Sequence, residues 1–338
     1  MKKIIKYSKS YNNILSLKSS FLKENKNNLD LVIKSNKLYK KNPKRTKCKN
    51  CEKKSLKKFI HNFHIDYYLC NYCGHLNGIY QDTKKFNNNL YSSKNGKNYS
   101  FRYDTDYKKR VKNIYLPKAE FLQKVIKKKI SLLEFGSGAG HFLKALELKK
   151  INAVGFEPNK TLKGIGQKKL KSNKISLSGM DEIYDLCENN KSYNTVALIG
   201  TLEHLEKPNL FLDNFNKSSA EYLYISVPIF SLSVFIESSF KNVFPRHLGF
   251  GHTHLYTNKS LELMAKRHNL KIVGEWWFGT DFPDLYRSLI VSSNALDKKL
   301  FETELDKKFF KVINNLQNEL DKQKICSEVH MVFQKKTR

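Results

Sequence analysis

The sequence contains no apolar run long enough to cross a membrane. Its most apolar stretch, residues 222–236 (YLYISVPIFSLSVFI), is shorter than the roughly 20 residues that a spanning helix needs, and Pro228 interrupts it. The first 20 residues are basic but include neither a sustained apolar region nor a small-residue cleavage site. We therefore predict a cytoplasmic chain without a membrane span, in which cysteines are metal ligands or buried thiols rather than disulfides.

Acidic residues are also scarce, because 31 Asp and Glu face 62 Lys and Arg and leave a formal net charge of +31. Such an excess is compatible with binding to nucleic acid or to an anionic membrane. However, it is mostly lysine, is spread over the whole chain and accompanies abundant Asn and Ile, as A- and T-rich codons would produce. We favour this compositional explanation, and the sequence has no clustered arginine patch of the kind that supports RNA binding.

Composition divides the 338 residues into four segments. Residues 1–46 form a basic N-terminal extension, either peripheral and helical or partly disordered. Residues 47–80 carry four cysteines in two pairs, and residues 81–106 are polar, turn-rich and typical of a linker. Residues 107–338 form the large domain.

In the large domain, apolar strand-like segments alternate with helical ones. A helix is expected over 115–129 and another over 307–323, with strands at ISLLEFG, NAVGFE, KISLSG, NTVALIG, YLYISVP, SLIVSS (288–293) and EVHMVFQK (328–335). This alternation predicts an α/β fold, namely a doubly wound, mostly parallel sheet of seven strands with helices on both faces.

The stretch LEFGSGAGHF at 133–142 is a glycine-rich turn between an expected strand and an expected helix, where nucleotide cofactors commonly bind. A dinucleotide fingerprint would place its third glycine where this chain has His141, and no P-loop ending of Gly-Lys-Ser/Thr is present. Glu134, at the end of the strand, would repel a pyrophosphate. The glycines that remain to approach a ligand are Gly136, Gly138 and Gly140.

Glu157 ends the next expected strand, about 20 residues beyond these glycines, where a carboxylate accepts hydrogen bonds from two ribose hydroxyls. Together with Glu134 it indicates a ligand that has a ribose and a positive charge but no phosphate. S-adenosylmethionine meets these conditions. The alternative is an ordinary strand–turn–helix unit with packing glycines.

The motifs LLEFGSGAGHFL, GFEP, LIGTLEHLEKP and LYISVP, in this order and spacing, resemble those of class I S-adenosylmethionine-dependent methyltransferases. The resemblance covers about residues 110–338 and implies a Rossmann-like methyltransferase domain. It implies that the methionine end of the cofactor is lined by Glu134, Gly136, Gly138 and Gly140. It also implies that Glu157 holds the ribose and that Met180 and Asp181 lie near the adenine.

The segments CKNC and CNYC contain Cys48 and Cys51 and then Cys70 and Cys73, with eighteen residues between the two pairs. Two Cys-x2-Cys pairs at this spacing predict a closed, structural zinc site in a small zinc-ribbon-like module rather than a redox pair. Such a module ahead of a methyltransferase core resembles the sugar methyltransferases of deoxysugar and surface-polysaccharide biosynthesis, in which the zinc module helps to cover the substrate cleft.

A hydroxyl acceptor requires a base, and two histidine groups follow the carboxyl ends of expected strands. His204, after Glu203, is either that base or a structural histidine bonded to a backbone carbonyl. His252 and His254 lie where the sugar C-methyltransferases resembled above have a Tyr-His-Glu-His segment. Here Gly251 and Thr253 replace the Tyr and the Glu, so a C-methylation mechanism does not carry over. We take His252 as the preferred base and His254 as either catalytic or structural.

The segment EWWFGTDFPDLYRSL at 275–289 is the other unusual stretch. Its aromatic residues would form a sugar-stacking wall or fill the core at a strand end, and its polar residues would bind the substrate. Arg287 could equally bind the diphosphate of a nucleotide-linked sugar. The candidate residues are Trp276, Trp277, Phe278, Asp281, Asp284 and Arg287.

These features predict a methyltransferase that acts on a hydroxyl of a sugar or glycan intermediate, with S-adenosylmethionine and structural zinc as cofactors. The second candidate is an RNA methyltransferase with a zinc-containing RNA-binding module. It is disfavoured because the chain lacks the Asn/Asp-Pro-Pro-aromatic signature of amino-group methylation, its fourth strand ending instead in Gly200, Thr201 and Leu202. The third candidate, a non-catalytic cofactor-binding module, fits least well with the intact glycine turn and the histidines.

Overall fold

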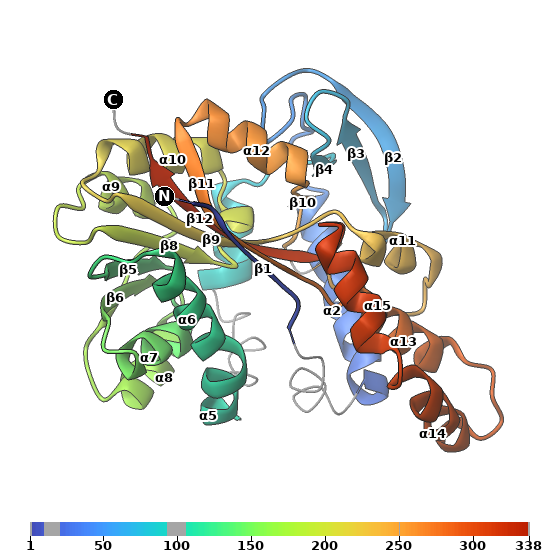
Figure 1. Ribbon diagram of the computed structural model, residues 1–338. Helices are drawn as coiled ribbons and strands as arrows, with labels where there is room; N and C mark the ends of the chain where they lie inside the picture. Colours follow the sequence, from blue (N-terminus) through green and yellow to red (C-terminus); the bar gives the residue numbers. More distant parts are fainter. Residues whose placement is uncertain (1, 10–20, 93–105, 250, 337–338) are drawn as a thin grey trace.

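The computed structural model describes residues 2–9, 21–92, 106–249 and 251–336. Within these residues the large sheet has eight strands in the order β1-β11-β12-β9-β8-β5-β6-β7 (Figure 1). Neighbouring strands are parallel except that β12 runs antiparallel to both β9 and β11. The strands are β1 (Ile4–Tyr7), β5 (Ser131–Phe135), β6 (Asn152–Glu157), β7 (Ile175–Leu177), β8 (Thr195–Ile199), β9 (Tyr222–Pro228), β11 (Leu270–Phe278) and β12 (Glu328–Lys335). The predicted α/β fold with a mostly parallel sheet is confirmed, with one strand more than expected.

The additional strand comes from the basic N-terminal extension. β1 pairs parallel with β11, with Ile4 opposite Gly274 and Tyr7 opposite Trp277, and so forms one edge of the sheet. Farther along the extension, α2 (Phe21–Tyr39) agrees with the helical periodicity of this segment. Residues 10–20 of the predicted extension and 93–105 of the predicted linker lie outside the described residues.

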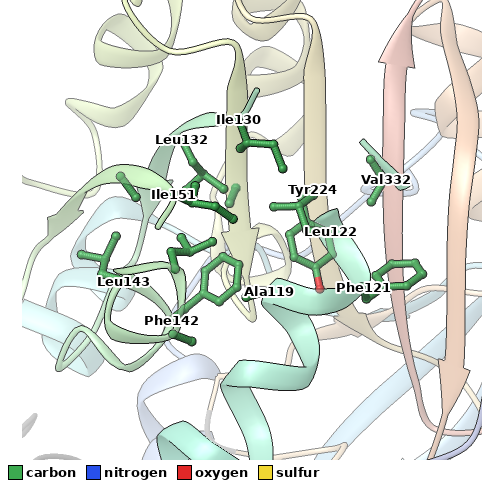
Figure 2. Close-up of a cluster of buried hydrophobic side chains, with 14 of the residues drawn as sticks. Ala119, Phe121, Leu122, Ile130, Leu132, Phe142, Leu143, Ile151, Tyr224 and Val332 are labelled. Atoms are coloured by element: carbon green, nitrogen blue, oxygen red, sulfur yellow. The ribbon is translucent and has the colours of Figure 1, made fainter. Parts of the chain in front are cut away.

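Helices cover both faces of the large sheet (Figure 1). One face is covered by α6 (Leu116–Val125), α7 (His141–Leu148) and α8 (Lys160–Leu170), and α5 (Tyr107–Arg110) and η3 (Val111–Tyr115) lead into α6. The other face is covered by α9 (Ile183–Glu188), α10 (Pro208–Lys217) and α12 (Asn258–Arg267). Figure 2 shows the first core, in which Phe121 and Leu122 of α6 and Phe142 of α7 pack towards Tyr224 of β9. Each large apolar side chain buried in this way stabilises the fold by roughly 2 kcal/mol.

In a second group of helices, α13 (Asp281–Ser292) contacts α2, α11 (Leu232–Ser239), α14 (Lys298–Phe309) and α15 (Ile313–Lys322). The strand predicted at 288–293 is wrong, because residues 288–292 belong to α13. Packing against four helices overrides the β-branched and apolar character of this segment. Like β1, the strand β11 was not predicted. None of the described helices has the length and apolar character needed to cross a bilayer.

A smaller antiparallel sheet has the order β10-β4-β3-β2 and contains β2 (Leu56–Asn62), β3 (Ile65–Cys70), β4 (Leu76–Gly78) and β10 (His254–Leu255). The first three strands belong to the predicted cysteine-rich module. β10 belongs to the long connection after β9, and its His254 pairs with Asn77 of β4. The small module is therefore joined to the large domain through a shared sheet.

Candidate active site

A pocket opens at the carboxyl ends of β5, β6 and β8, the edge at which open α/β sheets bind ligands. The turns after these three strands line it, together with Met180 beyond β7. Leu90 and Tyr91 form a further wall. They belong to η1 (Asn88–Ser92), which follows α3 (Lys84–Asn87) in the predicted linker. The pocket brings together Gly136, Gly138, Glu157, Met180 and His204 of the predicted site.

The glycine turn bends in a way that other residues rarely allow. Gly136 and Gly138 have φ angles of 73° and 55°, in the left-handed region. A side chain at Gly136 would clash with Thr201, whereas a Cβ atom at Gly138 would meet no atom within 4 Å. There is therefore open space beside the Cα atom of Gly138. Gly140 does not line the pocket, and a Cβ atom there would press against Leu170 and Ile175 at 3.0 Å.

Glu157 is held rigidly at the pocket wall by the backbone. Its Oε2 accepts a hydrogen bond from the Gly138 N–H at 2.7 Å, and its Oε1 accepts one from the Asn159 N–H at 2.9 Å. Burial raises the pKa of Glu157 to about 7, although both backbone bonds act in the opposite direction. Each carboxylate oxygen retains a second lone pair that can accept a hydrogen bond from a ribose hydroxyl.

Glu134 lies at the end of β5 and is not part of the pocket lining. It is buried, and its Oε2 has no hydrogen-bond partner among the described residues. Burial raises the pKa of Glu134 to about 8, repulsion from Glu157 adds to the increase, and Lys118 opposes it. A buried carboxylate oxygen without a donor is costly, and the ammonium group of a ligand would satisfy it.

Met180 and Asp181, the two residues predicted to lie near the adenine, differ in their position relative to the pocket. Met180 lines the pocket. The Asp181 side chain is 50% exposed, is not part of the lining and pairs with Lys84 of α3. This ion pair connects α3 with the turn after β7. The structure therefore favours Met180 over Asp181 as a pocket residue.

Composition gave no indication that the segment 84–92 would cover the pocket. The Tyr91 hydroxyl lies 2.7 Å from Nδ1 of His204, and the Asn159 side chain donates to the Tyr91 carbonyl at 2.8 Å. The Asn87 side chain donates to the His204 carbonyl at 3.1 Å. An aromatic residue within a polar segment was the one signal for this role in the sequence.

Glu203, His204 and His252 come together beside the pocket. One potential ligand atom from each lies within 4.8 Å of the others, and the His204 and His252 rings stack with centroids 5.1 Å apart. Burial raises the pKa of Glu203 to about 8 and lowers the pKa of His252 to about 4. His204 lines the pocket, while His252 is half-buried next to it.

His254 has a different environment from the other two histidines. It is completely buried, its Nε2 lies 2.9 Å from the Glu203 carbonyl oxygen, and its Nδ1 lies 2.8 Å from Nε2 of His75. Both ring nitrogens are thus occupied within the protein. This arrangement matches the structural alternative, and we do not retain His254 as a base.

The expected sugar-stacking wall is in the core. Trp276, Trp277 and Phe278 are at most 4% exposed, and the Trp277 indole N–H donates to Glu275 at 3.0 Å. Successive strand residues point to opposite faces, so Trp276 and Trp277 enter different cores. We therefore do not retain Trp277 as a substrate contact.

The predicted polar contacts are also buried, and they connect structural elements. Asp281 accepts hydrogen bonds from the Ser231 hydroxyl at 2.6 Å and from the Ser327 N–H at 3.0 Å. Asp284 accepts one from Arg246 at 3.0 Å. The Arg287 guanidinium lies over the Phe244 ring, 4.3 Å from its centroid. These contacts hold α13 against α11 and the 244–248 segment, away from the pocket lining.

The four predicted zinc ligands form one buried cluster. Cys48 and Cys73 have their Sγ atoms 3.7 Å apart, and Cys51 and Cys70 have theirs 3.6 Å apart. Tetrahedral zinc with bonds of about 2.3 Å requires sulfur–sulfur distances of about 3.8 Å, so the cluster fits this metal. The Asn77 side chain also points its N–H at Cys48 Sγ at 3.6 Å.

Comparison with known proteins identifies a methyltransferase domain in this chain. Residues 107–275 match the family described as methyltransferase domain, and no curated protein matches the chain. One similar structure is magnesium protoporphyrin IX methyltransferase from Synechocystis PCC 6803 with bound SAH, at 10% identity and a TM-score of 0.48, covering 75% of this chain and 100% of that one. Another is an S-adenosylmethionine-dependent methyltransferase from Archaeoglobus fulgidus, at 17% identity and a TM-score of 0.46, covering 70% and 100%. A third is the complex of the Haloferax volcanii Trm112 methyltransferase activator with a putative methyltransferase, at 11% identity and a TM-score of 0.46, covering 72% and 96%.

The family match covers half of the chain and includes the glycine turn, Glu157 and the segment that contains Glu203 and His204. The chain therefore belongs to the methyltransferase-domain family and is an S-adenosylmethionine-dependent methyltransferase.

Proposed function

We propose that this protein methylates a hydroxyl group of a sugar or glycan intermediate. The proposal is supported by the hydrogen bond that His252 makes to the backbone. Its Nδ1 lies 3.1 Å from the Arg246 carbonyl oxygen, which can only accept a hydrogen bond. Nδ1 therefore carries the proton and Nε2 has the free lone pair of a base. Burial lowers the pKa of His252 to about 4, so the ring is neutral at neutral pH.

The proposed cofactor contacts follow from the pocket. Glu157 would accept hydrogen bonds from the ribose, Met180 would contact the adenine, and the turn at Gly136 and Gly138 would approach the methionine end. Glu134, whose buried Oε2 has no donor, would neutralise the ammonium group from behind this turn. S-adenosylmethionine, when bound, supplies a methyl group on a positively charged sulfur.

The protein's own contribution is then to align the acceptor, exclude water and remove one proton. Leu90 and Tyr91 cover the pocket, and Tyr91 fixes the His204 ring. Nε2 of His252 would take the hydroxyl proton as the acceptor oxygen bonds to the methyl carbon. Base catalysis of this kind contributes about 10²- to 10⁴-fold to a rate. We also propose that the four cysteines hold a structural zinc ion that supports the small sheet.

A direct experiment incubates the purified protein with S-adenosylmethionine and either nucleotide sugars or RNA. We expect S-adenosylhomocysteine and a singly methylated sugar from at least one nucleotide sugar. His252→Gln should reduce turnover by about 10²-fold or more, with unchanged binding of S-adenosylhomocysteine. Methylation of RNA alone would replace the sugar proposal with the second candidate, with which the net charge of +31 is compatible.

A further inference from the structure

The cluster of Glu203, His204 and His252 has the composition of a metal site that is separate from the cysteines. Its side chains come from two segments, η4 (Leu202–His204) after β8 and the connection before β10. One potential ligand atom from each residue lies within 4.8 Å of the others. Two imidazoles and one carboxylate on one side of a pocket leave coordination positions open for a substrate.

Glu203 provides an independent indication of a bound cation. The residue is only 3% exposed, and its Oε2 has no hydrogen-bond partner among the described residues. In the part of the chain that the structure describes, its one ion-pair partner is His204, at 3.8 Å. Leaving a carboxylate oxygen buried without a donor or a cation is costly, and a metal ion would remove this cost.

The two histidines are oriented by hydrogen bonds on the nitrogen that would not bind the metal. Nδ1 of His252 donates to the Arg246 carbonyl, and Nδ1 of His204 lies 2.7 Å from the Tyr91 hydroxyl. Metal-binding histidines almost always have such a partner on their second nitrogen, because it fixes the tautomer and the direction of the ring. Nε2 of His252 is then available as a ligand atom, and Nε2 of His204 lies 3.8 Å from Oε1 of Glu203.

We infer that Glu203, His204 and His252 bind a divalent metal ion of the class that accepts imidazole and carboxylate ligands, such as Mn²⁺, Fe²⁺ or Zn²⁺. The metal site does not depend on the proposed function. Only the activation of a sugar hydroxyl by the metal ion rests on that function. Coordination of the acceptor oxygen would lower the pKa of the hydroxyl, and the proton would leave to a water molecule that enters with the acceptor. The oxygen then bonds to the methyl carbon, and the electron pair of the breaking carbon–sulfur bond remains on sulfur. In the metal-bound enzyme, the metal replaces His252 as the activating group.

Mn²⁺ is the appropriate probe, because it prefers oxygen and nitrogen ligands to the thiolates of the cysteine cluster. The zinc-loaded full chain is titrated with Mn²⁺, and free Mn²⁺ is followed by electron paramagnetic resonance. We expect one tightly bound Mn²⁺ per chain. Glu203→Gln and His252→Ala should each weaken binding by more than about 100-fold, and Tyr91→Phe by about 10- to 100-fold. His64→Gln, at an exposed histidine, is the matched control and should bind Mn²⁺ normally.

Circular dichroism of each variant establishes that it is folded. Failure of the wild-type protein to bind Mn²⁺, or equal binding by folded Glu203→Gln and His252→Ala, would overturn the inference. If a protein that binds no Mn²⁺ methylates a sugar, and chelators do not inhibit it, the inferred metal site is wrong and the proposed function stands. If the protein binds Mn²⁺ tightly but methylates no sugar, the metal site stands and the proposed function is wrong.

Discussion

The Nε2 atom of His75 lies 2.8 Å from the Nδ1 atom of His254, and this hydrogen bond joins the cysteine-rich module to the active site. His75 is two residues beyond Cys73, and Nε2 of His254 in turn lies 2.9 Å from the carbonyl oxygen of Glu203. That oxygen only accepts hydrogen bonds, so Nε2 of His254 donates and its Nδ1 accepts from His75. A continuous chain of donors therefore connects the small sheet with the backbone of η4.

Replacement of His254 should loosen η4 and destabilise the protein. His254→Leu leaves the buried Glu203 carbonyl without a donor, which costs about 1–3 kcal/mol. We expect this loss in the free energy of unfolding measured in urea, together with a reduced turnover rate. His254→Gln retains an N–H donor and should recover part of both quantities. Equal stability of the wild-type protein and His254→Leu would contradict the role assigned to this bond.

Loss of one cysteine ligand should release zinc and lower the melting temperature. Cys70→Ser removes a thiolate from the buried cluster, and β3, which ends at Cys70, pairs with both β2 and β4. We expect less than one zinc ion per chain by metal analysis. Cys187→Ser is the control, because Cys187 is also a buried thiol but packs in the core of the large domain. Zinc content that falls equally in both variants would argue against a four-cysteine site.

The carboxylate of Glu157 should determine cofactor affinity. Hydrogen bonds to a charged group contribute about 1.5–3 kcal/mol, so Glu157→Ala should weaken binding of S-adenosylhomocysteine by at least about tenfold in calorimetry. Asp181→Asn serves as the comparison, because Asp181 is exposed and does not line the pocket. We expect its affinity to change by less than about twofold. A larger effect at Asp181 than at Glu157 would mean that the adenosine lies elsewhere.

The buried carboxyl of Glu134 should make stability and cofactor binding depend on pH in opposite directions. Its folded-state pKa is raised to about 8, so the folded protein holds a proton that the unfolded chain loses near pH 4.5. The free energy of unfolding should therefore fall as pH rises from about 4.5 to 8, by an amount on the order of a few kcal/mol. Binding of a cation favours the carboxylate, so affinity for S-adenosylhomocysteine should rise over the upper part of this range.

The glutamine side chain of Glu134→Gln is neutral at every pH. This variant should therefore lose the pH dependence that Glu134 gives to the free energy of unfolding and to the affinity for S-adenosylhomocysteine. Urea unfolding and calorimetry at pH 6, 7 and 8 measure the two quantities. Unchanged pH profiles in Glu134→Gln would show that Glu134 does not titrate in this range.

The cofactor half of the site could be predicted from the sequence because it depends on local geometry. A strand, a glycine turn and a helix place Gly136 and Gly138 in one loop, and Glu157 follows at the end of the next parallel strand. Likewise, Cys48, Cys51, Cys70 and Cys73 predicted one cluster from their spacing alone.

The part of the site that would bind the methyl acceptor depends on contacts between residues far apart in the chain. The local sequence pattern does not encode such contacts. Tyr91 lies in a polar segment 113 residues before His204, and its hydroxyl contacts the His204 ring. β1 has only four residues and joins the sheet by pairing with β11 near the other end of the chain. Asp281, Asp284 and Arg287 resembled a binding site in sequence, but in the folded protein Asp281 bonds to Ser231, Asp284 bonds to Arg246, and Arg287 lies 3.6 Å from Asp284.

The most direct test of the account is a crystal structure of the protein with S-adenosylhomocysteine. We predict that both ribose hydroxyls bond to the Glu157 carboxylate and that the sulfur faces the side of the pocket formed by Glu203, His204 and His252. A nucleoside bound away from Glu157, or a sulfur that points away from this cluster, would contradict it.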